Sequence, residues 1–320
     1  MSVLVYTESD KGNYKKVAYE VASYAKAVAD QLGTSVTAVS INANDTSSLG
    51  NYGVDKVLNI NNSALDTFNA KSYAAAIQQA AEKEGASVVV ISSSADSKYL
   101  APALAVGLNA GYASNVVEAP SSVSPFTVKR TAFTNKAFTN TEIRTDVKIV
   151  GVSNNSYGLV ENSGSAATED FSPSLPESGV SVDSVDKATD KVTIADAEIV
   201  VSGGRGLKGP ENWGMVEELA EVLGAATACS KPVSDLGWRP HSEHVGQTGK
   251  PVASNLYIAI GISGAIQHLA GINASKVKVV INTDPEAPFF KAADYGIVGD
   301  AFEVVPKLTE KLKAFKAQNA

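Results

Sequence analysis

Val88-Val89-Val90-Ile91 is an unbroken run of β-branched residues, and it follows an Ala-rich segment in which Tyr73, Ile77 and Ala80 recur at steps of four and three. The run predicts a buried strand, and the spacing before it predicts a helix. A strand without polar alternation is covered on both of its faces, and helices between such strands supply the cover. This stretch therefore predicts an α/β fold built on a parallel sheet.

The same alternation extends outward from this stretch. Further strands are expected at residues 3–6, 36–41 and 57–60, and a helix is expected where apolar residues recur between 17 and 32. Residues 127–153 alternate short β-type segments with Thr, Asn and charged residues, which predicts antiparallel strands appended to the sheet. Residues 154–179 are rich in Ser, Asn, Gly, Pro and Glu, and they predict an exposed connection.

A second alternation of strands and helices occupies the C-terminal part. Its expected elements are strands at 199–202 and 277–282, a helix at 216–223 behind Trp213, and a terminal amphipathic helix at 305–315. We therefore expect two domains with a boundary near residue 188. Residues 1–188 would form a parallel-sheet domain of nucleotide-binding type with added antiparallel strands, and residues 189–320 a doubly wound, Rossmann-like domain.

Composition excludes several classes of protein. Hydrophobic residues make up 44% and charged residues 19% of the 320 positions, which is typical of a globular protein. The single Cys229 allows neither an internal disulfide nor a cysteine-based metal cage. A net charge of −7 without a basic patch argues against nucleic-acid binding. The longest apolar run, Leu256–Ile266, is about half a membrane span, and the N-terminus lacks signal or transit features, so we expect a cytoplasmic protein that is not membrane-embedded.

The segment Gly204-Arg-Gly-Leu-Lys-Gly209 fits the G-x-G-x-x-G fingerprint of dinucleotide-binding turns, and it follows an expected strand. The fingerprint also needs an acidic residue about 20 positions later, where this chain has Ala228-Cys-Ser-Lys231. A pyridine-nucleotide site is therefore disfavoured. A phosphate-binding turn, in which Arg205 and the backbone amides face an anion, is favoured over a tight turn without function.

The segment Gly246-Gln-Thr-Gly-Lys250 is similar to part of a nucleotide-binding P-loop. His244 stands where that motif needs glycine, and Pro251 stands where it needs a magnesium-binding Ser or Thr, so nucleoside triphosphate hydrolysis is not expected. The two glycines beside a Gln and a Thr predict a flexible polar loop that can approach a planar ring closely, and a plain turn explains the segment equally well. His241 and His244 are expected to form an exposed, solvated pair rather than a zinc site.

The segment Ile260-Gly-Ile-Ser-Gly-Ala-Ile-Gln-His268 begins as an apolar strand and is expected to turn into a helix at Ser263, a good N-cap residue. Amides in the first turn of that helix would face the strand end and hold a phosphate. A helix cap without a ligand is the alternative. Asn282 and Asp300 also follow expected strand ends, where ligands of open α/β sheets collect.

Five motifs, in this order, resemble the α subunit of electron transfer flavoproteins. They are Val201–Lys208, Val245–Lys250, Leu256–Gly271, Asn282–Pro288 and Ala293–Val298. The similarity is strong across residues 198–312 and looser, mainly in the order of elements, across residues 1–188. The resemblance implies a non-covalently bound FAD, held mostly by the second domain, and an electron transfer flavoprotein β subunit as partner.

Carried over residue by residue, the resemblance implies an FAD site shared among several segments. Arg205 would meet the pyrophosphate. The isoalloxazine ring would be lined by Ser230, Val245, Gly246, Gln247 and Thr248. Phosphate, ribityl chain and ring would be held by Ser263, Gly264, Ala265, Ile266, Gln267 and His268, and the adenosine end by Asn282, Asp300 and Ala301.

Two positions depart from the family pattern. Lys231 stands where the family usually has Arg beside the isoalloxazine, and Phe133-Thr-Asn-Lys-Ala137 replaces a Tyr-Ala-Gly-Asn-Ala motif of the first domain. The first departure concerns how a positive charge tunes the flavin, because Lys is a more flexible and more hydrated point charge than Arg. The second concerns only details of the first domain.

The resemblance implies an electron carrier rather than an enzyme. Such a carrier passes electrons from flavin dehydrogenases, for example the acyl-CoA dehydrogenases of fatty acid β-oxidation, to a quinone oxidoreductase or another acceptor. The identity of donor and acceptor, and the choice between simple transfer and electron bifurcation, stay open. The alternative is a nucleotide-binding α/β protein without redox function, which would be colourless where a flavoprotein is yellow.

Overall fold

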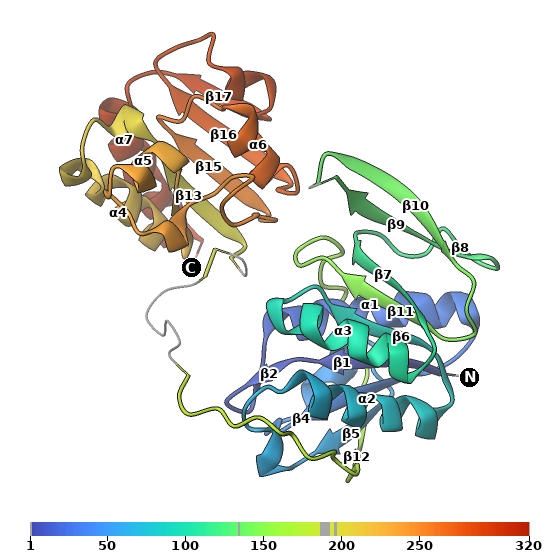
Figure 1. Cartoon of the computed structure of the whole chain (residues 1–320). Helices are drawn as coiled ribbons and strands as arrows, with labels where there is room; N and C mark the ends of the chain where they lie inside the picture. Colours follow the sequence, from blue (N-terminus) through green and yellow to red (C-terminus); the bar gives the residue numbers. More distant parts are fainter. Residues whose placement is uncertain (1, 134, 186–192, 195–196, 320) are drawn as a thin grey trace. The chain divides into compact units, whose positions relative to one another are not determined.

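The chain divides into two units, each built around its own sheet (Figure 1). The computed structural model describes residues 2–133, 135–185, 193–194 and 197–319. The first unit comprises residues up to 132 and 138–185, and the second contains residues 133 and 135–137 together with the described residues from 193 onward. The boundary expected at residue 188 lies outside the described residues.

A large, mostly parallel sheet forms the first unit. Within the described residues its strands follow the order β10-β9-β7-β11-β6-β1-β4-β5-β12, and β8 pairs with β9. Their bounds are β1 (Ser2–Thr7), β4 (Val36–Ile41), β5 (Lys56–Ile60), β6 (Ala86–Ser92), β7 (Gly111–Val116), β8 (Ser122–Val123), β9 (Phe126–Ala132), β10 (Ala137–Ile143), β11 (Lys148–Val152) and β12 (Ala167–Asp170). A small separate pair, β2 (Ser9–Asp10) with β3 (Asn13–Tyr14), follows β1.

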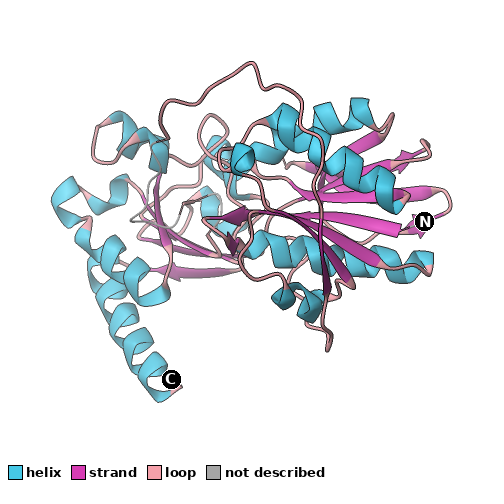
Figure 2. Ribbon diagram, turned by 90° about the horizontal axis from the view of Figure 1, so that it is seen from below, coloured by secondary structure: helices cyan, strands magenta, loops and turns pink. Residues whose placement is uncertain are grey.

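Successive residues of the central strands enter two different cores. Val3 and Val5 of β1 pack with α1 (Lys16–Leu32), whereas Leu4 and Tyr6 pack with α2 (Ala70–Glu84) and α3 (Ala95–Gly107). Side chains alternate between the two faces of a strand, so a strand that is apolar throughout needs cover on both sides. Helices lie on both faces of this sheet (Figure 2). The expected parallel sheet covered on both faces is confirmed.

Residues 127–153 are only partly antiparallel. β9 pairs antiparallel with β7 and β8, as expected. β11 instead lies between β6 and β7 and is parallel to both, so the expectation of an appended antiparallel strand was wrong there. Residues 149–152 are buried, and their run Ile-Val-Gly-Val has the pattern of an interior parallel strand. The Thr- and Asn-rich segments before this run obscured it.

The connection after β11 is fastened to the first unit. β12 pairs parallel with β5. The buried Glu20 carboxylate of α1 accepts hydrogen bonds from the backbone N–H groups of Asn155, Tyr157 and Gly158 at 2.8 to 2.9 Å. The expected connection is therefore present, and a buried carboxylate anchors its beginning.

A five-stranded parallel sheet forms the second unit, counted over the described residues. The strand order is β14-β13-β15-β16-β17, with β13 (Ile199–Gly203), β14 (Ala226–Cys229), β15 (Leu256–Ile260), β16 (Val277–Asn282) and β17 (Tyr295–Val298). The helices are α4 (Gly214–Leu223), α5 (Lys231–Asp235), α6 (Ile266–Ile272) and α7 (Ala301–Gln318).

The helices of the second unit lie on both faces of its sheet. α4 and α7 pack with Val201, Ile258 and Ile281, whereas Ile272 of α6 packs in the other core. The chain runs from β13 to β14 on one side and then to β15 on the other, so the strand order reverses between β13 and β15. This is the doubly wound arrangement that the sequence predicted. No helix in the described part of the chain is both long enough and apolar enough to cross a membrane.

Candidate functional site

The carboxyl ends of four strands surround a cavity of about 570 Å³ in the second unit. Arg205 follows β13, Ser230 follows β14, Ser263 follows β15, and Asn282 ends β16. Residues 244–248 form another part of the wall. Open α/β sheets bind ligands where the strand order reverses, and this volume is in the range of small-molecule sites.

Most of the residues expected at the site line this cavity. They are Arg205, Ser230, Lys231, Val245, Gly246, Gln247, Thr248, Ser263, Ala265, Gln267, His268 and Asn282. The lining does not include Gly264, Ile266, Asp300 or Ala301. Ile266 is 72% exposed on α6, and Ala301 is buried in the core at the start of α7. Ligand contacts by these four residues stay predictions.

The turn after β13 uses its backbone amides within the protein. The Gly204 N–H donates to the Ile260 carbonyl at 2.8 Å, and the Gly206 N–H donates to the Gly261 carbonyl at 3.0 Å. The N–H groups of the next three residues donate to carbonyls of the turn itself. The amides of Gly204, Gly206 and residues 207–209 are therefore used within the protein, and the binding of an anion at this turn stays a prediction. The exposed Arg205 side chain at the cavity remains available to an anion.

Glycine is required in this turn because two backbones touch. A Cβ on Gly204 would overlap the Gly261 carbonyl oxygen, and a Cβ on Gly206 would lie 2.6 Å from the Gly261 Cα. Gly261 itself has a φ of +63°, which other residues rarely adopt. The G-x-G pattern therefore serves the packing of this turn on the end of β15.

The segment between β15 and α6 also differs from expectation. α6 begins at Ile266 after the N-cap Ala265, which makes no side-chain cap. Ser263 lies earlier, where its carbonyl accepts the Phe289 N–H at 3.0 Å and the residue is exposed at the cavity. Ser263 is therefore not the helix cap. Gly264 has a φ of +84°, a left-handed conformation that delays the start of the helix.

Two residues expected to hold the adenosine end have partners within the protein. The Asn282 Nδ2 donates to the Ile262 carbonyl at 3.1 Å, and its Oδ1 accepts the Asp284 N–H at 3.0 Å. Asp300 caps α7 by accepting the Phe302 N–H at 3.0 Å. Asn282 thus shapes the cavity wall, whereas Asp300 has a structural role at a helix end.

Lys231 forms an ion pair at the edge of the cavity. Its Nζ lies 2.9 Å from Oδ1 of Asp235, one turn later on α5, and both side chains are more than half exposed. Such a pair adds little stability, but the carboxylate offsets part of the ammonium charge. Ser230 is buried as the N-cap of α5 and makes no side-chain cap. Its hydroxyl is thus not committed to the helix.

Two buried histidines belong to the cavity wall. Nε2 of His268 lies 3.0 Å from Oη of Tyr257, and the Val245 main chain also interacts with this imidazole. Burial, together with the nearby His244, lowers the pKa of His268 to about 4, so this imidazole is neutral at pH 7. Burial is also the main cause that lowers the pKa of His244.

His244 is one of the cavity-lining residues that the sequence analysis missed, together with Gly206, Pro232, Asp235, Gly261 and Ile262. His244 was expected to be exposed and solvated beside His241, but it is 1% exposed and lines the cavity. Its position in the sequence could have indicated this, because it directly precedes Val245, the first residue of the polar loop that was expected at the site. The Val245 N–H donates to the Cys229 carbonyl at 3.0 Å, which draws this part of the chain inward.

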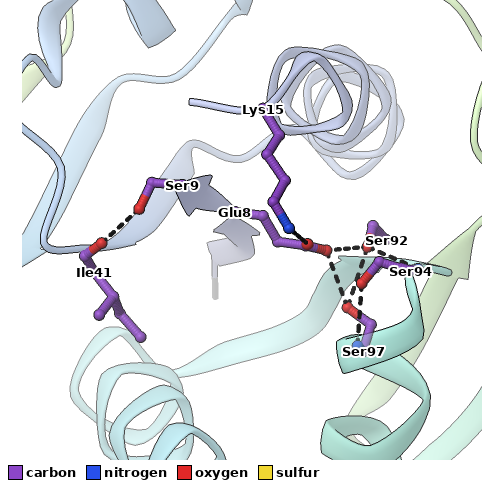
Figure 3. A network of polar contacts seen from close by, with 7 residues as sticks. All are labelled: Glu8, Ser9, Lys15, Ile41, Ser92, Ser94 and Ser97. Carbon is purple, nitrogen blue, oxygen red and sulfur yellow. Dashed lines mark hydrogen bonds and ion pairs between the residues drawn. The ribbon is translucent and has the colours of Figure 1, made fainter. Parts of the chain in front are cut away.

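The equivalent place in the first unit is closed by the protein's own side chains (Figure 3). The first sheet reverses its strand order between β1 and β6, and Glu8 follows β1 there. Glu8 is 2% exposed, accepts hydrogen bonds from the hydroxyls of Ser92 and Ser97, and pairs with Lys15 at 3.1 Å. Lys15 offsets the charge of this carboxylate, so the end of β1 is occupied by a polar network in which the protein's own groups are partners. The cavity described above lies at the corresponding place in the second unit.

Comparison with known proteins agrees with this division. Residues 193–273 match the family model described as the electron transfer flavoprotein FAD-binding domain, and residues 3–176 match the electron transfer flavoprotein domain. The chain is 39% identical to electron transfer flavoprotein subunit alpha of Bacillus subtilis, with 97% of each chain covered. It is 36% identical to the subunit alpha of Pseudomonas aeruginosa, with 96% of this chain and 99% of the relative covered.

A third relative, the electron transfer flavoprotein subunit alpha of Syntrophomonas wolfei, is 34% identical, with 97% of this chain and 98% of the relative covered. These matches extend through both units, and the FAD-binding model covers Arg205, Ser230, Thr248, Ser263 and His268 of the cavity. The chain therefore belongs to the electron transfer flavoprotein family, as an α subunit whose second unit carries the FAD-binding domain.

Proposed function

We propose that this chain is the FAD-holding subunit of a heterodimeric electron carrier, completed by a β subunit, which takes electrons from flavin dehydrogenases and delivers them to a downstream acceptor. The observation that carries the proposal is the convergence of Arg205, Ser230, Thr248 and Ser263, from four separate segments, on one cavity. One cation and three hydroxyls fit a pyrophosphate that is joined to a polyhydroxyl chain and a polar ring.

The cavity fits FAD on two further counts. The buried Nδ1 atom of His244 has no partner within the described residues, so the wall holds a hydrogen-bonding group that the protein does not use. Asp235 is the one carboxylate among the described lining residues, and Lys231 pairs with it. The wall therefore carries no unpaired negative charge that would oppose a bound pyrophosphate.

When bound, FAD accepts and releases electrons. The part of this chain is to bind and orient it. Arg205 would hold the pyrophosphate through charge-assisted hydrogen bonds. Thr248 would donate a hydrogen bond to the ring edge from its exposed position at the cavity, and Lys231 would set the local positive charge. His268 is held in one orientation by Tyr257 and contributes a neutral imidazole.

A pyridine-nucleotide dehydrogenase fits the cavity less well. Dinucleotide-binding turns need free backbone amides and an acidic residue that binds the ribose. Here the Gly206 amide donates to the Gly261 carbonyl, and the chain continues from Cys229 at the end of β14 into Ser230 and Lys231. The Gly206 amide is therefore already used, and no acidic residue stands directly after β14.

Coexpression with the β subunit tests the proposal. The purified complex should be yellow, and the flavin released on denaturation should elute as FAD in chromatography. It should also be reduced by a flavin dehydrogenase with its substrate. Arg205→Ala should weaken FAD retention, whereas Arg144→Ala, which removes an exposed arginine of the first unit, should not. A colourless complex, or one that releases NAD in place of FAD, contradicts the proposal.

A further inference from the structure

His244 lies inside the loop of residues 245–250, which carries Thr248 and is called the 245–250 loop below. A Cβ on Gly249 would lie 2.4 Å from the His244 carbonyl oxygen and 2.9 Å from Cγ of its ring, whereas a Cβ on Gly246 would be in ordinary contact with Nε2 at 3.4 Å. The main chain and the ring of His244 together therefore exclude a side chain at position 249. Glycine at this position lets the loop fold closely around the ring.

Main-chain hydrogen bonds at and beside His244 hold both ends of the 245–250 loop. The His244 carbonyl accepts the Lys250 N–H at 2.8 Å. His244 forms a parallel bridge with Cys229, through the Val245 N–H that donates to the Cys229 carbonyl at 3.0 Å. A displacement of His244 therefore moves the loop relative to the end of β14.

The imidazole of His244 lacks the surroundings that stabilise a second proton. It is 1% exposed, and no described residue hydrogen-bonds its Nδ1. The charged and titratable groups that face it are Lys231 and Asp235 of α5, His241 before the loop, and His268 of α6. Of these, Asp235 favours a positive charge, and its carboxylate is paired with Lys231. A buried imidazolium would therefore be poorly compensated.

We propose that His244 is a positioning residue of the FAD site, and that the 245–250 loop keeps its binding conformation only while this imidazole is neutral. The inference rests on the proposed FAD site, since Gly246, Gln247 and Thr248 line the cavity. Protonation places an uncompensated positive charge within the loop. The loop then moves away from the imidazole, so that water can solvate the charge. That movement displaces the part of the cavity wall formed by Gly246, Gln247 and Thr248, and FAD dissociates more readily in mild acid. By linkage, bound FAD favours the neutral imidazole to the same extent.

The pH dependence of FAD binding by the complex with the β subunit tests this proposal. A ligand that requires the loss of one proton binds about tenfold more weakly for each pH unit below the pKa of the group. For the wild type, the dissociation constant of FAD should rise with this slope below the pKa of His244 in the FAD-free complex, which burial lowers from its ordinary value. In His244→Gln, the slope of the logarithm of the FAD dissociation constant against pH should be smaller by about one, which corresponds to one proton. His241→Gln is the matched control. The ring centroid of His241 lies 5.2 Å from that of His244, but His241 does not line the cavity.

Fluorescence of released FAD measures binding without any electron-transfer assay, and circular dichroism shows whether each variant is folded. His244→Asn is a second variant that cannot titrate. The proposal is wrong if a folded His244 variant shows the same pH dependence of FAD binding as the wild type. It is also wrong if FAD binds more tightly in acid. If neither variant folds, the His244 Cε1–H resonance of the wild type decides, because its apparent pKa must be lower with FAD than without it. Failure of the proposed function is distinct, since the wild type would then bind no FAD at any pH.

Discussion

The Tyr257 hydroxyl lies 3.0 Å from Nε2 of His268, and both side chains are buried. Tyr257 in turn stacks against Phe289, with ring centroids 6.5 Å apart. Burial raises the pKa of Tyr257, so its hydroxyl stays protonated at all ordinary pH values.

Tyr257→Phe should lower the free energy of unfolding by about 1–3 kcal/mol, because Nε2 of His268 is then buried without a partner. Chemical denaturation of the complex measures the change. Tyr295→Phe is the control, since Tyr295 is 67% exposed at the edge strand β17 and should change stability little. Equal losses in the two variants would show that the hydrogen bond is not the cause.

Acid should destabilise the second unit through His268. Its pKa is about 4 in the folded chain and near 6.5 when unfolded, so the unfolded state takes up the proton first as the pH falls. The contribution of His268 is therefore complete above about pH 6.5 and is lost progressively toward pH 4, by on the order of 3 kcal/mol. Unfolding curves across this range should decline less steeply for His268→Gln. An NMR titration of His268 with a midpoint near 6.5 contradicts this prediction.

Thr248→Val should retain FAD and change its reduction potential. One hydrogen bond of about 1 kcal/mol corresponds to roughly 40 mV for a one-electron couple. Ser263→Ala should instead weaken FAD binding about fivefold, because its hydroxyl faces the cavity without capping α6. Potentiometry and equilibrium dialysis separate the two effects. Loss of FAD in the first variant and a changed potential in the second would reverse the assignment.

Lys231→Ala should lower the potential of bound FAD, and Lys231→Arg should hold or raise it. Asp235→Asn should raise it, because the ammonium is released from its partner at 2.9 Å. Both side chains are largely exposed, so solvent screening limits each shift to tens of millivolts. Potentiometry of the three variants provides the measurement. Unchanged potentials in all of them would mean that this pair does not act on the flavin.

Glu20→Ala should destabilise the first unit by about 3 kcal/mol or more, since it leaves three backbone N–H groups without their acceptor. Limited proteolysis should cut faster between residues 154 and 160. The control is Glu118→Ala, which removes a surface ion pair with Lys129 and should cost less than about 1 kcal/mol. Similar losses of stability in the two variants would argue against the anchoring role of Glu20.

The strands were predictable where burial on both faces leaves an unbroken apolar run. The strand at Val36–Ile41 was expected with the bounds that it has. β11 was assigned the wrong direction because its neighbours in sequence are the exposed residues of β9 and β10, whereas its neighbours in space are β6 and β7. The direction of a strand depends on these distant partners, which a local pattern does not contain.

The cavity was predictable where side chains define it and less so where the main chain does. The spacing of Gly204 and Gly206 suggests a phosphate turn, but the partner of the Gly206 amide is residue 261, far along the chain. Ser263 is a good cap by residue type, yet the left-handed Gly264 sets the start of the helix. The burial of His244 depends on Gly249 folding back over it. Each miss reflects a tertiary contact that overrides a local preference.

The crossing of the β13 turn over the end of β15 limits how this site can be altered. A designer who wished to convert it to a pyridine-nucleotide site could add an acidic residue after β14, but the amides of Gly204 and Gly206 would stay tied to Ile260 and Gly261. A new ligand that used these two amides would have to break both hydrogen bonds. The same crossing holds the segment of Arg205 next to the end of β15, so the separation between Arg205 and Ser263 is set by main-chain hydrogen bonds and not by flexible side chains.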